Sequence, residues 1–336
     1  MGKKTVLFAL TKPLLERLFF GEDIQRIRAA CDVADVPVPE AADKPFVLAH
    51  VGGANIAITS WGTARFDDDV MAKADALEMV NYAAGSVKPI VSDALWKRGV
   101  RVTSGAGAIA YGVAETCVGY ILTVPKRLHW AALNTAAGGW KLPDAFGPAF
   151  EIYRQKIGVI GAGHIGRLVI GMLHAFDCDV LVYDPYLTAD AAADLGATKA
   201  ETLEEIFSQC RVVTLNAPTT DETRGMLRGE HFAMLAPGSV FINTARNEVI
   251  NEPEFIDALR KARFVACLDV TGPVEPPPAD HPYRTLGNVL LTPHVAGCFA
   301  ENSRRIGKFV ADAIEAFVAG EPLRFEVTEA MLATIA

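Results

Sequence analysis

The chain of 336 residues is long enough for two domains of ordinary size, and its 51% of hydrophobic residues provide a core for each. Forty acidic against 32 basic residues give a formal charge of −8 without a dense block of Lys and Arg, so nucleic acid is not an expected partner. No uninterrupted apolar stretch approaches the 18 residues of a membrane span and no cleavage-site pattern follows the N-terminus, so we expect a cytoplasmic protein without a membrane partner.

The six cysteines lie far apart along the chain, at Cys31, Cys117, Cys178, Cys210, Cys267 and Cys298. Their spacing fits neither a zinc site nor a dense disulfide framework. We therefore expect reduced, mostly buried thiols and predict no metal.

Residues 1 to about 105 alternate strand-like and helix-like segments and contain no Gly-rich phosphate loop. The pattern predicts helices at Leu14–Ala30 and Ser92–Arg98 in a small α/β unit with a parallel sheet. The strands are expected at Thr5–Leu10, Phe46–His50, Ile56–Thr59, Met79–Tyr82 and Val100–Thr103. An apolar segment, Ala110–Leu128, then predicts a buried helix, and a Gly- and Pro-rich loop follows at Ala136–Pro148.

A glycine pattern after a short apolar run dominates the middle of the chain. Ile157–Ile160 predicts a buried strand, and Gly161, Gly163 and Gly166 follow where a strand turns tightly into a helix. Such glycines permit the turn, the approach of a pyrophosphate to backbone N–H groups, and close helix–strand packing. The helix N-terminus then faces the phosphates.

A second apolar run, Val180–Tyr183, ends in Asp184, eighteen residues after Gly166. This spacing is near that of an acid which binds the adenosine ribose, so the two features together predict a bound dinucleotide. A carboxylate accepts hydrogen bonds from ribose hydroxyls and repels a 2′-phosphate, which favours NAD over NADP. The alternative is an acid that only caps the strand end. His164 is expected beside the pyrophosphate and not as an acid or base.

The strand and helix pattern becomes regular from Lys156 onward. Thr202–Glu205 is a capping box that marks a helix start. An amphipathic helix is expected at about Glu301–Ala319 and ends at Gly320. Further strands, which bring this domain to six, are expected at Val212–Leu215, Val240–Asn243, Val265–Asp269 and Val289–Leu291.

The nucleotide-binding domain is complete at the last of these strands, so the final helix is expected to return to the N-terminal domain. We predict a discontinuous substrate-binding domain at 1–105 and 299–336, and a Rossmann NAD-binding domain at 106–298. The fold class is α/β, with two doubly wound parallel-sheet domains, the first flavodoxin-like, and an active-site cleft between them.

Three charged residues follow late strands, where ligands bind in open α/β sheets. Arg246 can hold a carboxylate with two parallel hydrogen bonds, although an arbitrary Arg is more often in a salt bridge. His294 follows a proline-fixed turn and can exchange a proton near neutrality, although a lone His is more often structural. Glu275, in a rigid Pro-rich segment, can pair with an imidazole or can be a solvated loop carboxylate.

These motifs resemble the D-isomer-specific 2-hydroxyacid dehydrogenase family over almost the whole chain. Several blocks match in the family's order, which is more specific than any one block. They are the glycine turn, Leu215–Pro218 with Glu222–Gly225, Asn243–Arg246, Leu268–Val270 with Glu275–Pro276, and Thr292–His294.

The resemblance implies catalytic roles for three residues. His294 would be the acid/base, Glu275 its partner, and Arg246 the residue that orients the substrate. Backbone amides of Ala84 and Gly85 would bind the substrate carboxylate together with Arg246 and His294. The cofactor contacts it implies are Gly161, Gly163, His164, Ile165, Gly166, Asp184, Ala217, Pro218, Thr223, Thr244, Ala245, Arg246, Asp269, His294 and Gly297.

We therefore expect hydride transfer between NAD(H) and a small 2-oxo/2-hydroxy carboxylate, of which the glyoxylate/hydroxypyruvate reductase type is one form. Alternatives are an NAD(H)-sensing regulatory protein of the same fold and a formate- or phosphite-type dehydrogenase. The family commonly pairs through the segment that matches Ala110–Trp140, which implies a homodimer. The chain departs from the family at Asn247, where Gly is usual, and at Asn251, where Asp is usual. Ser104 and Ile109 stand where the family often has asparagines, in a loop near the hinge.

Overall fold

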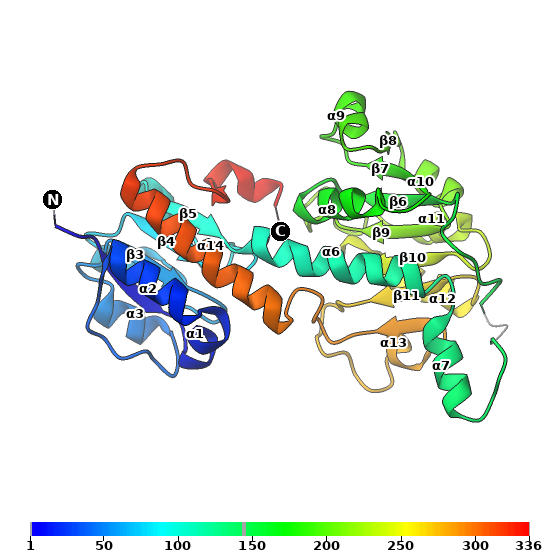
Figure 1. Ribbon diagram of the computed structural model, residues 1–336, viewed down its shortest axis with the longest axis horizontal. Coiled ribbons are helices and arrows are strands. Elements are labelled where there is room, and N and C mark those ends of the chain that lie inside the picture. Colours follow the sequence, from blue (N-terminus) through cyan, green and yellow to red (C-terminus); the bar gives the residue numbers. More distant parts are fainter. Residues whose placement is uncertain (1, 143–145, 336) are drawn as a thin grey trace. The chain divides into compact units, whose positions relative to one another are not determined.

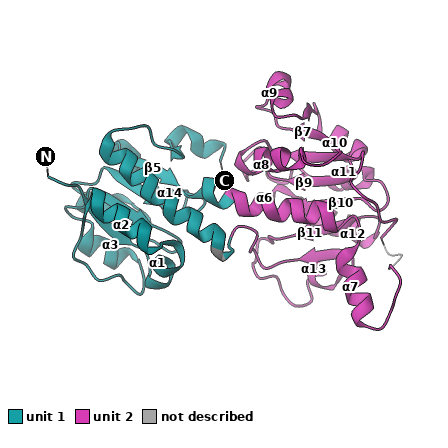
Figure 2. Cartoon of the chain, in the orientation of Figure 1, with its two compact units in different colours: residues 1–109, 298–336 teal, residues 110–297 magenta. Residues whose placement is uncertain are grey.

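The computed structural model describes residues 2–142 and 146–335. The chain divides into two compact units (Figure 2). Unit 1 comprises Met1–Ile109 and Cys298–Ala336, and unit 2 comprises Ala110–Gly297. Each contains one mainly parallel β-sheet with helices, so the predicted fold class of two doubly wound α/β domains is confirmed.

The sheet of unit 1 has the flavodoxin-like order in its parallel strands. Among the described residues its order is β13-β5-β4-β3-β1-β2, in which only β13 is antiparallel to its neighbour. The strands are β1 Thr5–Ala9, β2 Asp32–Val33, β3 Ile56–Thr59, β4 Met79–Tyr82, β5 Arg101–Ser104 and β13 Glu326–Val327. The helices are α1 Lys12–Leu18, α2 Gly21–Ala30, α3 Lys44–His50, α4 Asp68–Lys73, α5 Asp93–Lys97, α14 Ala300–Ala319 and the 3-10 helix η2 Glu329–Ala333.

The strand expected at Phe46–His50 is wrong, because this segment forms α3. The Asp43 carboxylate accepts a hydrogen bond from the Phe46 amide at 3.0 Å and so caps the helix. Pro45 stands in the first turn, where its missing N–H costs nothing. A short apolar run alone does not distinguish a strand from a buried helix.

The single helix expected at Leu14–Ala30 is also wrong, since the segment forms α1 and α2. Phe19 and Phe20 between them have extended backbone, and the Phe20 amide donates to the Asp23 carboxylate at 3.1 Å. The amphipathic final helix is confirmed as α14, which Gly320 ends in a left-handed conformation. α14 packs beside α1 and α2 (Figure 1).

The sheet of unit 2 is fully parallel and has the Rossmann order. Among the described residues the order is β12-β11-β10-β9-β6-β7-β8. The short strand β8 brings it to seven strands where six were expected. The strands are β6 Lys156–Ile160, β7 Asp179–Tyr183, β8 Thr198–Lys199, β9 Val212–Leu215, β10 Val240–Asn243, β11 Val265–Leu268 and β12 Val289–Leu291.

The helices that accompany this sheet begin with α6, in which the chain passes from unit 1 to unit 2. The helix expected at Ala110–Leu128 begins earlier and ends earlier, because Arg127 has left-handed backbone between α6 and α7. The loop expected at Ala136–Pro148 includes residues 143–145, which lie outside the described residues. The helices are α6 Ala106–Thr123, α7 Leu128–Ala136, α8 His164–Leu173, α9 Ala189–Asp194, α10 Leu203–Gln209, α11 Gly229–Met234, η1 Asn247–Val249, α12 Glu252–Arg260 and α13 Pro282–Thr285.

The inner strands of both sheets are buried on both faces. All residues of β3, β4, β9, β10 and β11 are buried, as expected for parallel strands covered by helices on each side. The helix start predicted at Thr202 is confirmed, because the Thr202 hydroxyl accepts a hydrogen bond from the Glu205 amide at 3.2 Å. The Glu205 carboxylate accepts from the Glu201 amide at 3.0 Å, so it does not return to Thr202 as a capping box would.

One helix passes a looser test for membrane spans, which allows the interruption by Glu115. Within the described ranges, α6 is long and apolar enough to cross a membrane by length and composition alone. A core helix of a soluble protein passes the same test. Ala114, Cys117 and Ile121 of α6 are fully buried, and their spacing places one face of the helix in the core.

Candidate active site

The predicted site residues of unit 2 gather along one edge of its sheet. Because neighbouring strands are parallel and in register, their carboxyl ends lie on the same edge. The residues that directly follow strands there are Gly161 after β6, Asp184 after β7, Thr244 after β10 and Asp269 after β11. This edge is therefore where the geometry can assemble a ligand site.

The glycine turn after β6 has the shape that the sequence predicts. Gly161 has φ of 95°, and a Cβ there would lie 2.8 Å from the Ala217 nitrogen. A Cβ on Gly166 would collide with the carbonyl oxygen of Gly161. At Gly163, which caps α8, no heavy atom lies within 4 Å of an added Cβ. The N-terminus of α8 is therefore uncovered at Gly163, as the approach of a pyrophosphate requires.

Asp184 is half-buried beside this turn. One carboxylate oxygen accepts a hydrogen bond from the Ala162 amide at 2.7 Å, and the other from the Tyr186 amide at 2.9 Å. A carboxylate has about four lone-pair sites, so two remain for ribose hydroxyls. Asp184 thus both fixes the turn and offers the acceptors that a dinucleotide needs, and these residues fit NAD.

The other predicted cofactor residues lie in the loops at the same edge. The Thr223 hydroxyl donates to the Pro218 carbonyl at 2.7 Å and so closes the loop after β9. Thr244 is buried, and its hydroxyl lies 3.0 Å from the sulfur of Cys117 in α6. His164 and Ile165 begin α8, and Gly297 is buried at the end of unit 2.

His294 and Glu275 form a close pair. The Nδ1 atom of His294 lies 2.7 Å from Oε2 of Glu275. The other oxygen of Glu275 accepts a hydrogen bond from the Thr271 amide at 3.2 Å. Both side chains are about half exposed, at 48% and 41%. With Nδ1 engaged, Nε2 of His294 is the nitrogen that can exchange a proton with a ligand.

A buried carboxylate shapes the loop that carries His294. Asp269 is 1% exposed and accepts hydrogen bonds from the amides of Val295 at 3.0 Å and Ala296 at 2.8 Å. The Thr292 hydroxyl donates to Asp269 at 2.6 Å. These contacts lie on both sides of His294 in the sequence, and the His294 backbone has a left-handed φ of 53°. Asp269 thereby fixes the backbone that carries the imidazole.

Helix α6 supports the same loop through two residues that the sequence reasoning missed. Because Thr292 gives its proton to Asp269, the Tyr120 phenol donates to the Thr292 oxygen, at 3.1 Å. Burial raises the pKa of Tyr120, which keeps it a donor. The Thr116 hydroxyl donates to the Ala296 carbonyl at 3.2 Å. Their spacing of four residues places both on one face of α6, but nothing in the sequence links that face to residue 292.

Arg246 ends the turn after β10. Asn243 is fully buried, and its amide donates to the Arg246 carbonyl at 3.1 Å while its oxygen accepts from the Ala245 amide at 3.0 Å. Nη1 of Arg246 donates to the Ala245 carbonyl at 2.6 Å. A guanidinium has five N–H donors, so Arg246 can keep this bond and still bind a carboxylate.

The remaining predicted residues, Ala84 and Gly85, belong to unit 1. They follow β4, and the Ser104 hydroxyl donates to the Gly85 carbonyl at 2.6 Å. Ala84 is buried. The structure thus fixes the shape of this turn within unit 1, and its role in substrate binding stays a prediction.

Residues 118–296 match the model of the D-isomer specific 2-hydroxyacid dehydrogenase, NAD binding domain. This is more than half of the chain. The chain belongs to the D-isomer specific 2-hydroxyacid dehydrogenase family. The match covers the glycine turn, Asp184 and the His294 loop, and it confirms NAD as the cofactor of this family member.

Two of the curated relatives are also named as dehydrogenases. The chain is 30% identical to D-3-phosphoglycerate dehydrogenase of Methanocaldococcus jannaschii over 291 residues, which cover 86% of this chain and 55% of that protein. It is 30% identical to formate dehydrogenase of Chaetomium thermophilum over 230 residues, 66% of this chain and 62% of that protein. The chain thus spans little more than half the length of these curated relatives.

The fold of this family member is also that of solved structures. D-mandelate dehydrogenase of Rhodotorula graminis superposes with a TM-score of 0.82 at 21% identity, over 97% of this chain and 98% of that chain. At this identity the likeness shows the fold.

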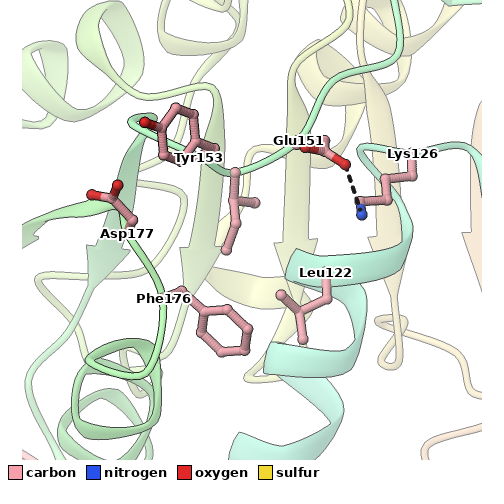
Figure 3. A pocket seen from close by; sticks show the side chains of 7 residues that line it. Leu122, Lys126, Glu151, Tyr153, Phe176 and Asp177 are labelled. Carbon is pink, nitrogen blue, oxygen red and sulfur yellow. Dashed lines mark ion pairs between the residues drawn. The ribbon is translucent and has the colours of Figure 1, made fainter.

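A separate hollow of about 440 Å³ lies at the opposite edge of the sheet (Figure 3). Glu151 and Tyr153 in its wall precede β6, and Phe176 and Asp177 precede β7, so it lies at the amino ends of these strands. Lys126 and Glu151 pair with each other there at 3.1 Å. Because the predicted site residues follow the carboxyl ends, this hollow is not part of the candidate active site.

Proposed function

We propose that the protein is an NAD-dependent D-2-hydroxyacid dehydrogenase that transfers a hydride between NAD(H) and a small 2-oxo/2-hydroxy carboxylate. The observation that carries this proposal is the His294–Glu275 pair at 2.7 Å, on a domain that matches the NAD-binding domain of the family. Such a pair supplies an acid/base whose orientation is fixed by a carboxylate. The D-3-phosphoglycerate dehydrogenase relative supports the same reaction class.

His294, Glu275 and Arg246 have separate roles in the proposed reduction of the carbonyl group. NADH, when bound, supplies a hydride to the carbonyl carbon. His294 donates the proton on Nε2 to the carbonyl oxygen, and Glu275 on Nδ1 holds the imidazole in the required tautomer. The Arg246 guanidinium binds the substrate carboxylate and stabilises the charge that develops on the oxygen. In oxidation, His294 accepts the hydroxyl proton and Glu275 stabilises the imidazolium.

Other parts of the proposal concern the surroundings of this chemistry. We propose that amides of Ala84 and Gly85 bind the carboxylate, and that the substrate is of the glyoxylate/hydroxypyruvate reductase type. We also propose a cytoplasmic homodimer, without nucleic acid or membrane partners. The net charge of −8 supports the absence of nucleic acid.

Replacement of the proposed acid/base tests the function. NADH oxidation is followed by absorbance with a panel of 2-oxo acids that includes glyoxylate and hydroxypyruvate. We expect His294→Ala to lower turnover of the preferred acid by about a hundredfold or more, while the Kd for NADH, read by fluorescence, changes little. His50→Ala is the matched control, because His50 lies in α3 and packs on Phe46. Full turnover of His294→Ala would sink the assignment.

The same assay distinguishes this function from the two alternatives, a formate- or phosphite-type dehydrogenase and an NAD(H)-sensing regulatory protein. NAD reduction with formate or phosphite, but not with 2-hydroxy acids, would identify the protein as a dehydrogenase of small anions, a possibility supported by the formate dehydrogenase relative. Binding of NADH without turnover of any acid or small anion would instead identify a sensor.

A further inference from the structure

A buried asparagine joins two parts of the candidate active site. Asn247 directly follows Arg246, begins η1 and is 3% exposed. Its Nδ2 group donates to the Gly272 carbonyl at 3.2 Å and to the Glu252 carboxylate at 3.1 Å. Its Oδ1 atom accepts from the Tyr283 phenol at 3.3 Å. Both amide protons and the amide oxygen of this side chain therefore have partners.

The Gly272 carbonyl belongs to the loop that carries Glu275. Glu275 in turn holds Thr271 through its amide at 3.2 Å and His294 at 2.7 Å. Gly272 is buried, and a Cβ there would come within 3.3 Å of the Asn247 Cβ. The loop thus lies directly against Asn247 before it turns outward to Glu275.

The other partners of Asn247 are themselves fixed. Tyr283 is 1% exposed, and burial raises the pKa of its phenol, so it remains a donor. Glu252 is in the first turn of α12. The asparagine is therefore held by two elements while it holds the loop, which is how a buried, fully satisfied polar network fixes a unique geometry.

We propose that Asn247 is a positioning residue, which holds the Glu275 loop against the turn of Arg246 and so keeps Glu275 in reach of His294. The inference rests on the proposed function for its catalytic consequence. Asn247 makes and breaks no bond in the reaction and acts through Glu275. A small displacement of Glu275 relative to His294 is enough to lower turnover, because proton transfer depends steeply on geometry.

An isosteric change tests this role. Asn247→Asp keeps the size of the side chain but replaces the donor to Gly272 with a carboxylate oxygen, which repels both the carbonyl and Glu252. Asn288→Asp is the matched control. Asn288 is 2% exposed and donates to the carbonyls of Leu259 and Phe264, each at 3.0 Å, so it suffers the same chemical change away from the loop.

Each replacement is combined with Glu275→Gln, and turnover of the preferred acid is measured in both backgrounds. We expect Asn247→Asp to lower kcat by about tenfold or more in the native background and by less than about threefold in Glu275→Gln, because the partner it positions has already been altered. Asn288→Asp should lower kcat by the same factor in both. Equal losses for Asn247→Asp in both backgrounds would overturn the proposal.

Hydrogen–deuterium exchange gives a second readout that needs no activity. We expect faster exchange of the amides of Thr271, Gly272, Val274 and Glu275 in Asn247→Asp, and no change there in Asn288→Asp. Asn247→Gly, which removes the side chain, should give the same result if Asn247→Asp does not fold. If the native protein turns over no acid, the proposed function fails. Faster exchange in Asn247→Asp would still support the role of Asn247 in holding the Glu275 loop. Unchanged exchange in a folded variant overturns it.

Discussion

Asp184 combines a structural and a selective role in one carboxylate. It holds the amides of Ala162 and Tyr186, and it offers its remaining lone pairs at the end of β7. Its negative charge opposes a 2′-phosphate, and each of its two oxygens accepts one amide proton of the turn. Replacement by Asn removes the charge and keeps the shape, but its amide has one acceptor oxygen, so it keeps only one of the two hydrogen bonds to the turn.

We predict that Asp184→Asn weakens the preference for NADH over NADPH by about tenfold or more, because a repulsive charge close to the 2′-phosphate is removed. The ratio of kcat/KM for the two cofactors measures this preference. Asp179→Asn is the matched control, since Asp179 begins the same strand at the opposite edge of the sheet. An unchanged ratio in Asp184→Asn would show that the acid only caps the strand end.

At the same scale, the sequence indicates which side chains carry chemistry but not what holds them. Arg246, Glu275 and His294 are visible because charged residues follow strands at recognisable spacings. Their supports, such as Thr292 and Asn247, are neutral residues whose partners are distant in sequence. A hydrogen bond between such residues depends on the angle of a loop in three dimensions, and no periodicity records it.

At the scale of the element, the first turn of α8 depends on the absence of a side chain at Gly166. A Cβ there would collide with the Gly161 carbonyl, which is backbone and cannot move aside without the turn. We predict that Gly166→Ala displaces the N-terminus of α8 and raises the Kd for NADH by about tenfold or more, because the helix dipole and amides no longer face the phosphates.

Gly171 of the same helix provides the control for this prediction. A Cβ at Gly171 meets no heavy atom within 4 Å. Gly171→Ala should keep NADH binding and stabilise the helix by up to about 1 kcal/mol, since Ala has the higher helix propensity. Fluorescence titration and thermal unfolding measure the two effects. A Kd raised equally in both variants would contradict the steric explanation.

Elements could be predicted where a pattern has one physical explanation. The glycine turn, the N-cap at Thr202 and the amphipathic α14 each satisfy one geometry only. Phe46–His50 fits a strand and a buried helix equally well by hydrophobicity, and the Asp43 cap decides for the helix. The edge strands β2, β8 and β13 have two residues each, too few for any periodicity.

At the scale of the whole molecule, the strand order within each unit follows from general rules of α/β topology. Parallel strands joined by right-handed crossovers leave few topologies, and the long alternation of strands and helices selects a doubly wound sheet in each unit. The position of a dimer interface follows from no such rule. It depends on apolar side chains that the fold leaves uncovered.

Several large apolar side chains between residues 128 and 142 are uncovered in the structure. Leu128, Leu133 and Leu142 are 49%, 57% and 50% exposed, and Trp140 is 90% exposed. Such side chains mark an interaction surface when they occur together. They support the proposed homodimer, in which this segment contributes to the interface.

We predict that the native chain has twice its own mass of 36.0 kDa in solution, and that Trp140→Ser shifts the equilibrium toward the single chain. An exposed Trp that becomes buried at an interface often contributes about 2 kcal/mol or more to the free energy of association. Its loss therefore raises the dissociation constant of the dimer about thirtyfold. Light scattering over a concentration series measures the shift. Tyr186→Ser is the control, because Tyr186 is 77% exposed outside this segment. A native chain of single mass at every concentration would contradict the dimer, and an equal shift in both variants would place the interface elsewhere.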